Sequence, residues 1–447
     1  MAGIYKSYDI RGVYPSELNE ETAENIGKAF GTINPGTIVV GGDSRLSTPS
    51  IKNKFILGLV SAGANVIDIG IVSTTMMIFA TGFYKYDGGV MITGSHTPSN
   101  YNGIKFYTKG AVSIPYENGI DKIEALVQTK LFKLGQGIIT KKDVFEDYKK
   151  FIIENSKFES DKRLKVVLDG SHGSSGKYYS NILRELGFDI VELFCEPDGR
   201  FPVHGPDPIK SLSQIKAKVV EEKADLGFIY DGDGDRWFVI KSDGELLDSN
   251  ILFVLLTKQV LSKCDSGKIV HDVMCSRMIS DAVEKYGGEL EICRVGHTHI
   301  ARMLSAVNGV FAGEVSGHYF FNETFNQDDV LLASIKLMEF LINNNTTIEE
   351  EILLIPEYFS EVSEANRATI KDSEKFRFID NLKTKLKNEG HNVDDTDGVK
   401  IIFDDGWALF RTSNTEPKIG FAYESTTKEG LDRIKIFVDK IVETIPK

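Results

Sequence analysis

The sequence predicts an α/β protein made of several related units, each with a parallel sheet at its centre. Short apolar stretches alternate with longer amphipathic segments through most of the 447 residues. Such repetition of strand, loop and helix implies right-handed crossovers between parallel strands, with ligand-binding loops at the carboxyl ends of the strands. A chain of this length is too long for one hydrophobic core, so roughly two to four domains are expected.

The first unit opens with two strands and a helix between them. The expected elements are a strand in "GTIVVGGD" (36–43), a helix in "STPSIKNKFILGLVSAG" (47–63) and a strand in "NVIDIG" (65–70). Ser47 or Thr48 is a suitable N-cap for this helix, and Gly63 is a suitable stop.

A later strand of this unit, at 88–92, ends in a polar turn. The stretch "MITGSHTPSNYNGIKF" (91–106) passes directly from apolar residues to Ser95 and His96, and it continues to Lys105. A strand end presents such a turn to solvent or to a ligand. By themselves these residues allow a nucleophilic serine, a phosphate site or a plain polar turn.

The same alternation returns further along the chain. It is seen in "LKVVLDGSHGSSGKYYSNILRELG" (164–187), "ADLGFIYDGDGDR" (224–236) and "GKIVHDVMCSRMISDAVEKYG" (267–287). "VMITGSH" and "VVLDGSH" place the same Gly-Ser-His after the same kind of strand, which favours related units, with coincidence as the alternative. Unit boundaries are expected near 137–142, 241–245 and 355–358.

The last part of the chain has a different pattern. The segment 399–425 reads as two or more strands with polar turns at 404–406 and 413–417, and a helix is expected at 427–445. Strands followed by a helix in this order fit a smaller α+β domain.

Charge and composition exclude several classes of protein. The formal net charge of -13 argues against nucleic-acid and anionic-membrane binders, because these need an exposed basic field. The N-terminal residues lack the apolar core of a signal peptide, and the weakly charged stretch 69–84 is interrupted by polar residues and glycine. Four widely spaced cysteines without a CxxC pair indicate reduced thiols, so a cytoplasmic protein is expected. Nothing decides the oligomeric state; a monomer is the expectation.

The strongest metal signal is "YDGDGDR" (230–236). Glycines between Asp231, Asp233 and Asp235 allow the backbone to turn tightly and bring three hard oxygens to one small cation. An EF-hand fits poorly, because Ser242 stands where the twelfth-position carboxylate belongs. Mg²⁺ is the expected cation, and three carboxylates would leave coordination positions open for a phosphate oxygen. A solvated acidic turn is the alternative.

Two further loops carry binding patterns. In "GEVSGHYFF" (313–321), Glu314, Ser316 and His318 alternate, so in an extended loop they would point to one side and suit hydroxyl recognition. An ordinary polar edge strand is the alternative. The second loop, "RTSNTEPKIG" (411–420), combines an arginine with hydroxyls, an amide and a turn, which together make a phosphate cradle; a ligand-free turn is its alternative.

The ordered set of motifs identifies a resemblance that spans nearly the whole chain. "YDIRG", "TGSHTPSNYNGIKF", "FPVHGPDP", "DGDGDR", "GEVSGH" and "RTSNTEP" follow one another as in the phosphohexomutase family, and they resemble its phosphomannomutase/phosphoglucomutase branch. The resemblance implies a heart-shaped α/β architecture with three related α/β domains and a C-terminal α+β domain. The expected domains are 1–140 with a phosphoserine loop, 141–244 with a metal loop, 245–356 with a sugar loop and 357–447 with a phosphate-binding loop.

The resemblance also implies a role for each motif. The catalytic residues would be Ser95, Arg11, His96, Lys105, Arg236 and His318. The substrate would be bound by Glu314, Ser316, His318, His297, Arg411, Ser413, Asn414 and Thr415. Mg²⁺ would be bound by Ser95, Asp231, Asp233 and Asp235. Phosphoserine would phosphorylate a mannose or glucose 1- or 6-phosphate, and the hexose 1,6-bisphosphate would turn around before returning a phosphoryl group. The second Gly-Ser-His, at Ser171 and His172, lacks the downstream Asn-Gly-x-Lys pattern and is not assigned to catalysis.

Some positions depart from the family pattern, and other functions stay open. Thr97 stands where the family usually has asparagine, and Met274 where the mannose/glucose branch commonly has lysine. Against the phosphoglucosamine branch, His297, Val315 and Asn414 differ from what that branch tends to carry. Phosphoglucosamine mutase is the nearest alternative; a phosphatase that loses the phosphoryl group to water and a non-catalytic phosphosugar-binding protein are the others.

Overall fold

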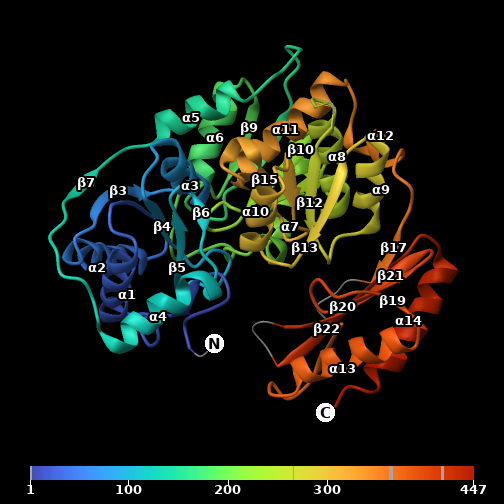
Figure 1. Ribbon diagram of the computed structural model, residues 1–447. Helices are drawn as coiled ribbons and strands as arrows, with labels where there is room; N and C mark the ends of the chain where they lie inside the picture. The colour runs from blue at the N-terminus through green and yellow to red at the C-terminus, as the bar shows by residue number, and fades with distance from the viewer. Residues whose placement is uncertain (1–2, 265, 362–365, 414–416, 447) are drawn as a thin grey trace.

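The computed structural model describes residues 3–264, 266–361, 366–413 and 417–446. They form four sheets with associated helices, arranged along the chain as four consecutive domains (Figure 1). The first three domains pack into one continuous body, and the fourth lies beside the third (Figure 1). No described helix is both long and apolar enough to cross a membrane.

The first domain has a mixed sheet in the order β1-β5-β4-β2-β3-β7, with β6 paired to β5. Its strands are β1 (Ile10–Val13), β2 (Thr37–Gly42), β3 (Asn65–Ile71), β4 (Gly88–Ile92), β5 (Tyr101–Thr108), β6 (Val112–Ser113) and β7 (Ile139–Lys141), and its helices are α1 (Glu20–Ile33), α2 (Thr48–Ser61), α3 (Thr74–Phe83), the 3₁₀ turn η1 (Tyr116–Asn118) and α4 (Ile120–Thr129). Ser47 is the N-cap residue of α2, as expected, but its side chain makes no capping bond. Gly63 follows the helix with φ 95°, a conformation that suits glycine.

The second domain repeats this plan with fewer strands, in the order β11-β10-β8-β9. Its elements are α5 (Phe145–Glu154), β8 (Lys165–Asp169), α6 (Gly176–Glu185), β9 (Asp189–Leu193), η2 (Pro208–Lys210), α7 (Leu212–Glu222), β10 (Leu226–Tyr230) and β11 (Trp237–Lys241). Strands β8, β9 and β10 run parallel, and β11 is antiparallel to β10.

The third domain has the order β13-β12-β14-β15-β16. Its elements are α8 (Ser249–Leu261), β12 (Lys268–Asp272), α9 (Arg277–Lys285), β13 (Glu289–Cys293), α10 (His297–Ala306), β14 (Phe311–Gly313), β15 (Tyr319–Phe321), η3 (Asn322–Thr324), β16 (Gln327–Asp328), α11 (Val330–Asn343) and α12 (Ile348–Ile352). Again the parallel strands end at an antiparallel neighbour, β15.

The three sheets therefore share one arrangement, and this confirms the prediction of related units. Strands β4, β10 and β14 occupy equivalent positions, and each is followed by an antiparallel strand. The two Gly-Ser-His motifs, however, follow β4 and β8, which are not equivalent strands. The feature shared by the equivalent strands β2, β8 and β12 is an aspartate at the carboxyl end, Asp43, Asp169 or Asp272, which accepts a hydrogen bond from the backbone N–H two residues later.

The fourth domain is an antiparallel sheet in the order β17-β22-β21-β20-β19, with β18 paired to β22. Its elements are β17 (Phe359–Glu361), β18 (Arg367–Thr369), α13 (Lys375–Asn388), β19 (Asn392–Asp394), β20 (Val399–Phe403), β21 (Gly406–Thr412), β22 (Lys418–Ser425) and α14 (Lys428–Val442). Thr427 caps α14 by accepting from Gly430 N, close to the expected helix start. The predicted α+β composition is thus confirmed.

The hydrophobic cores explain how the domains are joined. One buried cluster includes Met77 of α3, Leu168 of β8 and Leu331 of α11, so it runs through the first three domains. The fourth domain has a core of its own and meets the third through a smaller cluster that contains Val273 and Trp407. The loops after β4, β10 and β14 can therefore be held in fixed positions relative to one another.

Candidate active site

The polar turn after β4 places Ser95 at a contact between the first and second domains. Ser95 is buried, and its backbone has φ 49°, an uncommon conformation for a residue with a side chain. Its N–H donates to Thr93 Oγ1 (2.8 Å), and its Oγ donates to Asp231 Oδ2 (2.8 Å) from the second domain. His96 Nδ1 lies 3.1 Å from the same Oγ.

A buried arginine, Arg45, stabilises this turn by hydrogen bonds to its carbonyl groups. Its guanidinium donates to the carbonyl oxygens of Ser95 (2.7 Å), Thr97 (2.5 Å), Pro98 (2.6 Å) and Tyr101 (3.0 Å) and pairs with Asp43 (Nε to Oδ2, 3.1 Å). A residue with five fixed N–H donors can satisfy such a turn, whereas lysine cannot. Thr97, the departure from the family pattern, donates from Oγ1 to Gly94 O (2.5 Å) and so stabilises the turn itself.

The three aspartates of the loop between β10 and β11 converge as predicted. One ligand oxygen from each of Asp231, Asp233 and Asp235 lies within 4.8 Å of the others, and all three residues are buried. Burial and the charges of its two neighbours raise the pKa of Asp231 well above its usual range. A bound cation would remove this cost.

These residues fit a small hard cation. Asp233 Oδ1 and Asp235 Oδ1 are buried and have no hydrogen-bond partner among the described residues. Oxygens of this kind are the ligands that Mg²⁺ prefers. Thr74 Oγ1 of the first domain donates to Asp233 Oδ2 (2.7 Å), which orients that carboxylate.

Lys105 of β5 reaches the same loop. Its Nζ donates to Asp233 Oδ2 (2.8 Å) and to Asp235. Although burial opposes it, the pKa of Lys105 is raised well above its usual value, because the charges of both aspartates favour the ammonium. Burial by itself would raise the pKa of the Asp233 carboxyl, but the charge of Lys105 outweighs burial and the pKa is lowered. Lys105 is therefore a buried cation in contact with the metal loop.

The loop that contains the second Gly-Ser-His packs against the metal loop and hydrogen-bonds to its backbone. Ser171 Oγ donates to Tyr230 O (2.5 Å), and Ser174 N donates to Gly232 O (3.0 Å). At Gly173, an added Cβ would lie 2.5 Å from Gly232 O, so only glycine permits this contact. His204 Nε2 lies 3.1 Å from Asp169 Oδ2 in the same region.

The third site loop differs from the sequence expectation. Residues 314–318 form a tight turn between β14 and β15, in which Gly317 N donates to Glu314 O (3.1 Å), and not an extended loop. The carboxylate of Glu314 accepts from Gly296 N (2.8 Å) and from Ser316 Oγ (3.0 Å). The physical reason is the short connection between two paired strands, which forces a hairpin.

His318, at the end of that turn, connects two domains. Arg236 Nε donates to His318 Nε2 (3.1 Å), and His318 Nδ1 lies 2.7 Å from Asp328 Oδ2 of β16. His297, the first residue of α10, stacks on His318 with ring centroids 5.7 Å apart. Burial is the largest cause that lowers the pKa of His297, to about 4.

The remaining predicted residues lie around this centre. Arg11 of β1 pairs with Asp9 (2.6 Å). Although burial opposes it, the charges of Asp9 and of the metal-loop aspartates raise the pKa of the Arg11 guanidinium. Arg411 of β21 pairs with Asp397 (Nη2 to Oδ2, 3.2 Å), whose Oδ2 also accepts from Val295 N (3.0 Å) of the third domain. Ser413 N donates to Lys418 O (2.9 Å). Asn414 and Thr415 lie outside the described residues.

Sequence reasoning missed three residues that build the site. Asp43 and Arg45 shape the serine turn, and the signal for them was "GGDSR" at the end of β2. Asp328 contacts His318, and only tertiary structure brings it there. Met274, the second departure from the family pattern, packs against the apolar cluster between the third and fourth domains.

Comparison with known proteins was made for the whole chain. The descriptions "Phosphoglucomutase/phosphomannomutase, alpha/beta/alpha" domain I, II and III match residues 3–134, 146–244 and 248–358, and the C-terminal domain of the same name matches 367–441. A phosphomannomutase/phosphoglucomutase from Pseudomonas putida is 35% identical over 455 residues, which cover 99% of this chain and 96% of that protein.

Two further relatives agree with this. A phosphoglucomutase from Neisseria meningitidis is 32% identical over 453 residues, covering 99% of this chain and 97% of that protein. A crystal structure of a phosphoglucomutase/phosphomannomutase family protein from Burkholderia thailandensis superposes with a TM-score of 0.91 at 31% identity, covering 98% of this chain and 97% of that one.

Proposed function

Because the chain belongs to the phosphoglucomutase/phosphomannomutase family, we propose that its reaction proceeds through a phosphoryl group carried on Ser95. The protein is a phosphohexomutase, an isomerase whose substrates are hexose phosphates. The observation that carries the proposal is the buried Ser95 Oγ, 2.8 Å from Asp231 Oδ2, in a centre that also contains the cation Lys105.

In the proposed first step, the bond between phosphorus and Ser95 Oγ breaks while a bond from phosphorus to a sugar hydroxyl oxygen forms. The hydroxyl proton passes to a base of the protein, and Ser95 Oγ is left as the acceptor for the return step. The bound hexose 1,6-bisphosphate then reverses its orientation, and its other phosphoryl group returns to Ser95. Arg11, His96, Lys105 and Arg236 supply positive charge or donors for the phosphoryl oxygens.

Mg²⁺ is the cation that we propose for Asp231, Asp233 and Asp235, together with an oxygen of the group on Ser95. When bound, it would offset negative charge on the transferring group. The support is the set of three buried carboxylates with two unpartnered oxygens among the described residues. Lys105 Nζ contacts two of these carboxylates but carries only one positive charge, so it leaves negative charge in the loop for a cation to offset.

The phosphate that does not react would be held by the fourth domain. We assign this to Arg411, Ser413, Asn414 and Thr415, and we assign the sugar hydroxyls to Glu314, Ser316, His318 and His297. Arg411 is available if a substrate phosphate replaces Asp397 as its partner. Mannose and glucose phosphates are the proposed substrates. A cytoplasmic location is proposed because the cysteines form no disulfide among the described residues, and reduced cysteines are typical of that compartment.

Replacement of Ser95 tests the proposal. Wild-type enzyme incubated with ³²P-labelled glucose 1,6-bisphosphate and Mg²⁺ is expected to acquire label, and Ser95→Ala is expected to acquire none and to lose conversion of mannose 1-phosphate and glucose 1-phosphate. The control is Ser213→Ala, at an exposed serine of α7, which should still be labelled. Turnover by Ser95→Ala at the wild-type rate would contradict the proposal.

The same assay separates the alternatives. Stoichiometric release of inorganic phosphate would indicate a phosphatase. Faster turnover of glucosamine 6-phosphate than of mannose 1-phosphate would indicate the phosphoglucosamine branch, and binding without turnover or labelling would indicate a non-catalytic protein.

A further inference from the structure

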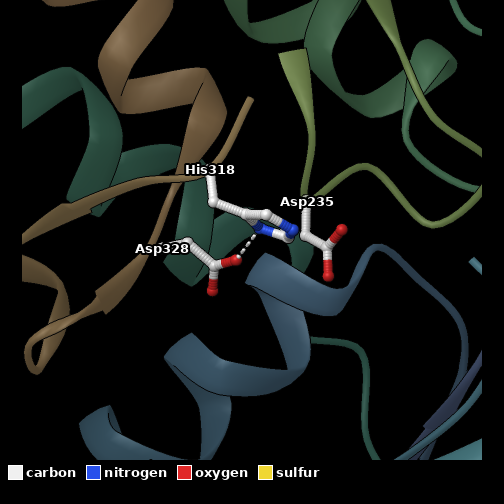
Figure 2. A group of neighbouring side chains, drawn as sticks. All are labelled: Asp235, His318 and Asp328. Carbon is white, nitrogen blue, oxygen red and sulfur yellow. Dashed lines mark hydrogen bonds and ion pairs between the residues drawn. The ribbon is translucent and has the colours of Figure 1, made fainter. Parts of the chain in front are cut away.

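Three buried side chains from three different segments meet beside the metal loop: Asp235, His318 and Asp328. Figure 2 shows the His318 ring between the two carboxylates, with Nδ1 directed to Asp328. Asp328 is 2% exposed and His318 4% exposed, so neither contact competes with bulk water. Asp328 has no role in the chemistry proposed above.

The two contacts of His318 define which ring nitrogen carries the proton. Arg236 Nε always donates, because a guanidinium has no acceptor, so His318 Nε2 must offer its lone pair in their 3.1 Å contact. Burial lowers the pKa of His318, in keeping with a neutral ring that has one N–H. That hydrogen is therefore on Nδ1, and it donates to Asp328 Oδ2 at 2.7 Å.

The same three residues could be taken for a metal site, because their ligand atoms lie within 4.8 Å of one another. The distance between His318 Nδ1 and Asp328 Oδ2 argues otherwise. Two ligands of one tetrahedral ion with bonds of ~2.0 Å stand about 3.3 Å apart. The observed 2.7 Å is the length of a hydrogen bond.

We propose that Asp328 is a positioning residue, which holds His318 as the neutral Nδ1–H tautomer, and that Arg236 covers the Nε2 lone pair until a phosphate group binds. This inference rests on the proposed function. A phosphoryl oxygen that attracts Arg236 frees Nε2, and the freed nitrogen takes the proton of the attacking sugar hydroxyl as its oxygen bonds to phosphorus. The base is thereby exposed only when an anionic group is present.

Nitrogen NMR tests the tautomer without any turnover. The chain has eight histidines, so the full-length enzyme labelled with ¹⁵N-histidine gives a spectrum in which His318 is assigned by its loss in His318→Gln. We expect two-bond ¹H–¹⁵N correlations of the Nδ1–H tautomer in the free enzyme, and a shift of Nε2 when glucose 6-phosphate is added. An Nε2–H tautomer would overturn the inference, and an unmoved Nε2 would overturn the part assigned to Arg236.

Asp328→Asn supplies the kinetic test. We expect it to perturb the tautomer and to lower kcat by about 10²-fold with little change in KM, the size of contribution that a positioned proton-transfer group makes. Asp329→Asn is the control, because Asp329 is a neighbouring buried carboxylate that caps α11 and bonds Tyr148 instead of His318; it should leave the His318 signals in place. An unchanged kcat in Asp328→Asn would contradict the proposal.

These results are separate from those for Ser95. If the wild-type tautomer is Nδ1–H but the protein is not labelled on Ser95, the proposed function fails and the positioning contact stands. If labelling succeeds and the tautomer is Nε2–H, the reverse is true. Stoichiometric zinc that is lost in Asp328→Asn would replace the hydrogen-bonded pair with a metal site.

Discussion

At the scale of single residues, the serine turn depends on a buried ion pair. The side chains of Arg45 and Asp43 are 0% and 2% exposed. Their charges are compensated by each other, by backbone groups and, for Asp43, by the hydroxyl groups of Thr48 and Thr93. A buried pair of this kind adds little net stability, but removing one partner leaves the other charge uncompensated. The arginine also satisfies four carbonyl oxygens of the turn.

We therefore expect Arg45→Met to destabilise the protein by about 3–5 kcal/mol and to reduce phosphorylation of Ser95. The measurements are the midpoint of urea unfolding and the labelling assay. Arg200→Met is the control, because Arg200 pairs with Asp198 at the surface. Its loss should leave the unfolding midpoint and the labelling of Ser95 unchanged. Equal effects of the two variants would refute a special role for Arg45.

At the scale of elements, a close approach of two loops positions the metal site. The loop after β8 contacts the loop after β10 through backbone groups of Gly173, Ser174 and Gly232. Backbone contacts transmit a small displacement directly to Asp231 and Asp233, which flank Gly232. The Gly-Ser-His after β8 therefore supports the metal loop and does not itself carry the chemistry.

Gly173→Ala tests this support. Its Cβ would lie 2.5 Å from Gly232 O, which cannot yield as a side chain could. We expect the Mg²⁺ concentration for half-maximal turnover to rise about 10–100-fold, as for other changes behind metal ligands. Gly205→Ala is the matched control, because a Cβ there meets nothing within 4 Å. A normal Mg²⁺ requirement in Gly173→Ala would show that the loop contact is dispensable.

At the scale of the whole molecule, the fourth domain is joined to the third by a small apolar cluster and by several hydrogen bonds. Lys400 Nζ donates to Val273 O (2.8 Å) across the boundary and lies 4.2 Å from the centroid of the Trp407 ring. Glu424 accepts from Arg277 N (2.9 Å) nearby. The arrangement in Figure 1, with three domains in one body and a fourth beside it, follows from the separate cores.

Lys400→Met is expected to loosen this junction while preserving the apolar packing of the side chain. Under the proposed function, KM for glucose 1-phosphate should rise by about 10–100-fold, because a hydrogen bond to a charged group is worth ~1.5–3 kcal/mol. The change in kcat should be smaller. Hydrogen exchange should increase at the boundary. Lys385→Met, at an exposed position of α13, is the control. Equal KM values in the two variants would show that Lys400 does not contribute to the docking of the fourth domain.

The sequence alone determined what periodicity and local chemistry encode. Alternating apolar strands and amphipathic helices predicted the α/β units, and the spacing of Asp231, Asp233 and Asp235 brought three carboxylates together through a short turn. The order of the motifs also indicated the family. The limits of the four domains and the roles of the site residues remain predictions from that order.

Only the tertiary structure decided how distant segments meet. Asp328 reaches His318 across ten residues of sequence, Arg45 reaches the carbonyl of Ser95 across fifty, and Lys105 reaches Asp233 of the metal loop across 128. The turn at 314–318 was predicted as extended, since alternation in sequence does not reveal that β14 and β15 are paired so closely. Local spacing is set by covalent geometry and so can be read from the chain, whereas contacts between separate strands, loops and domains depend on how all the cores pack.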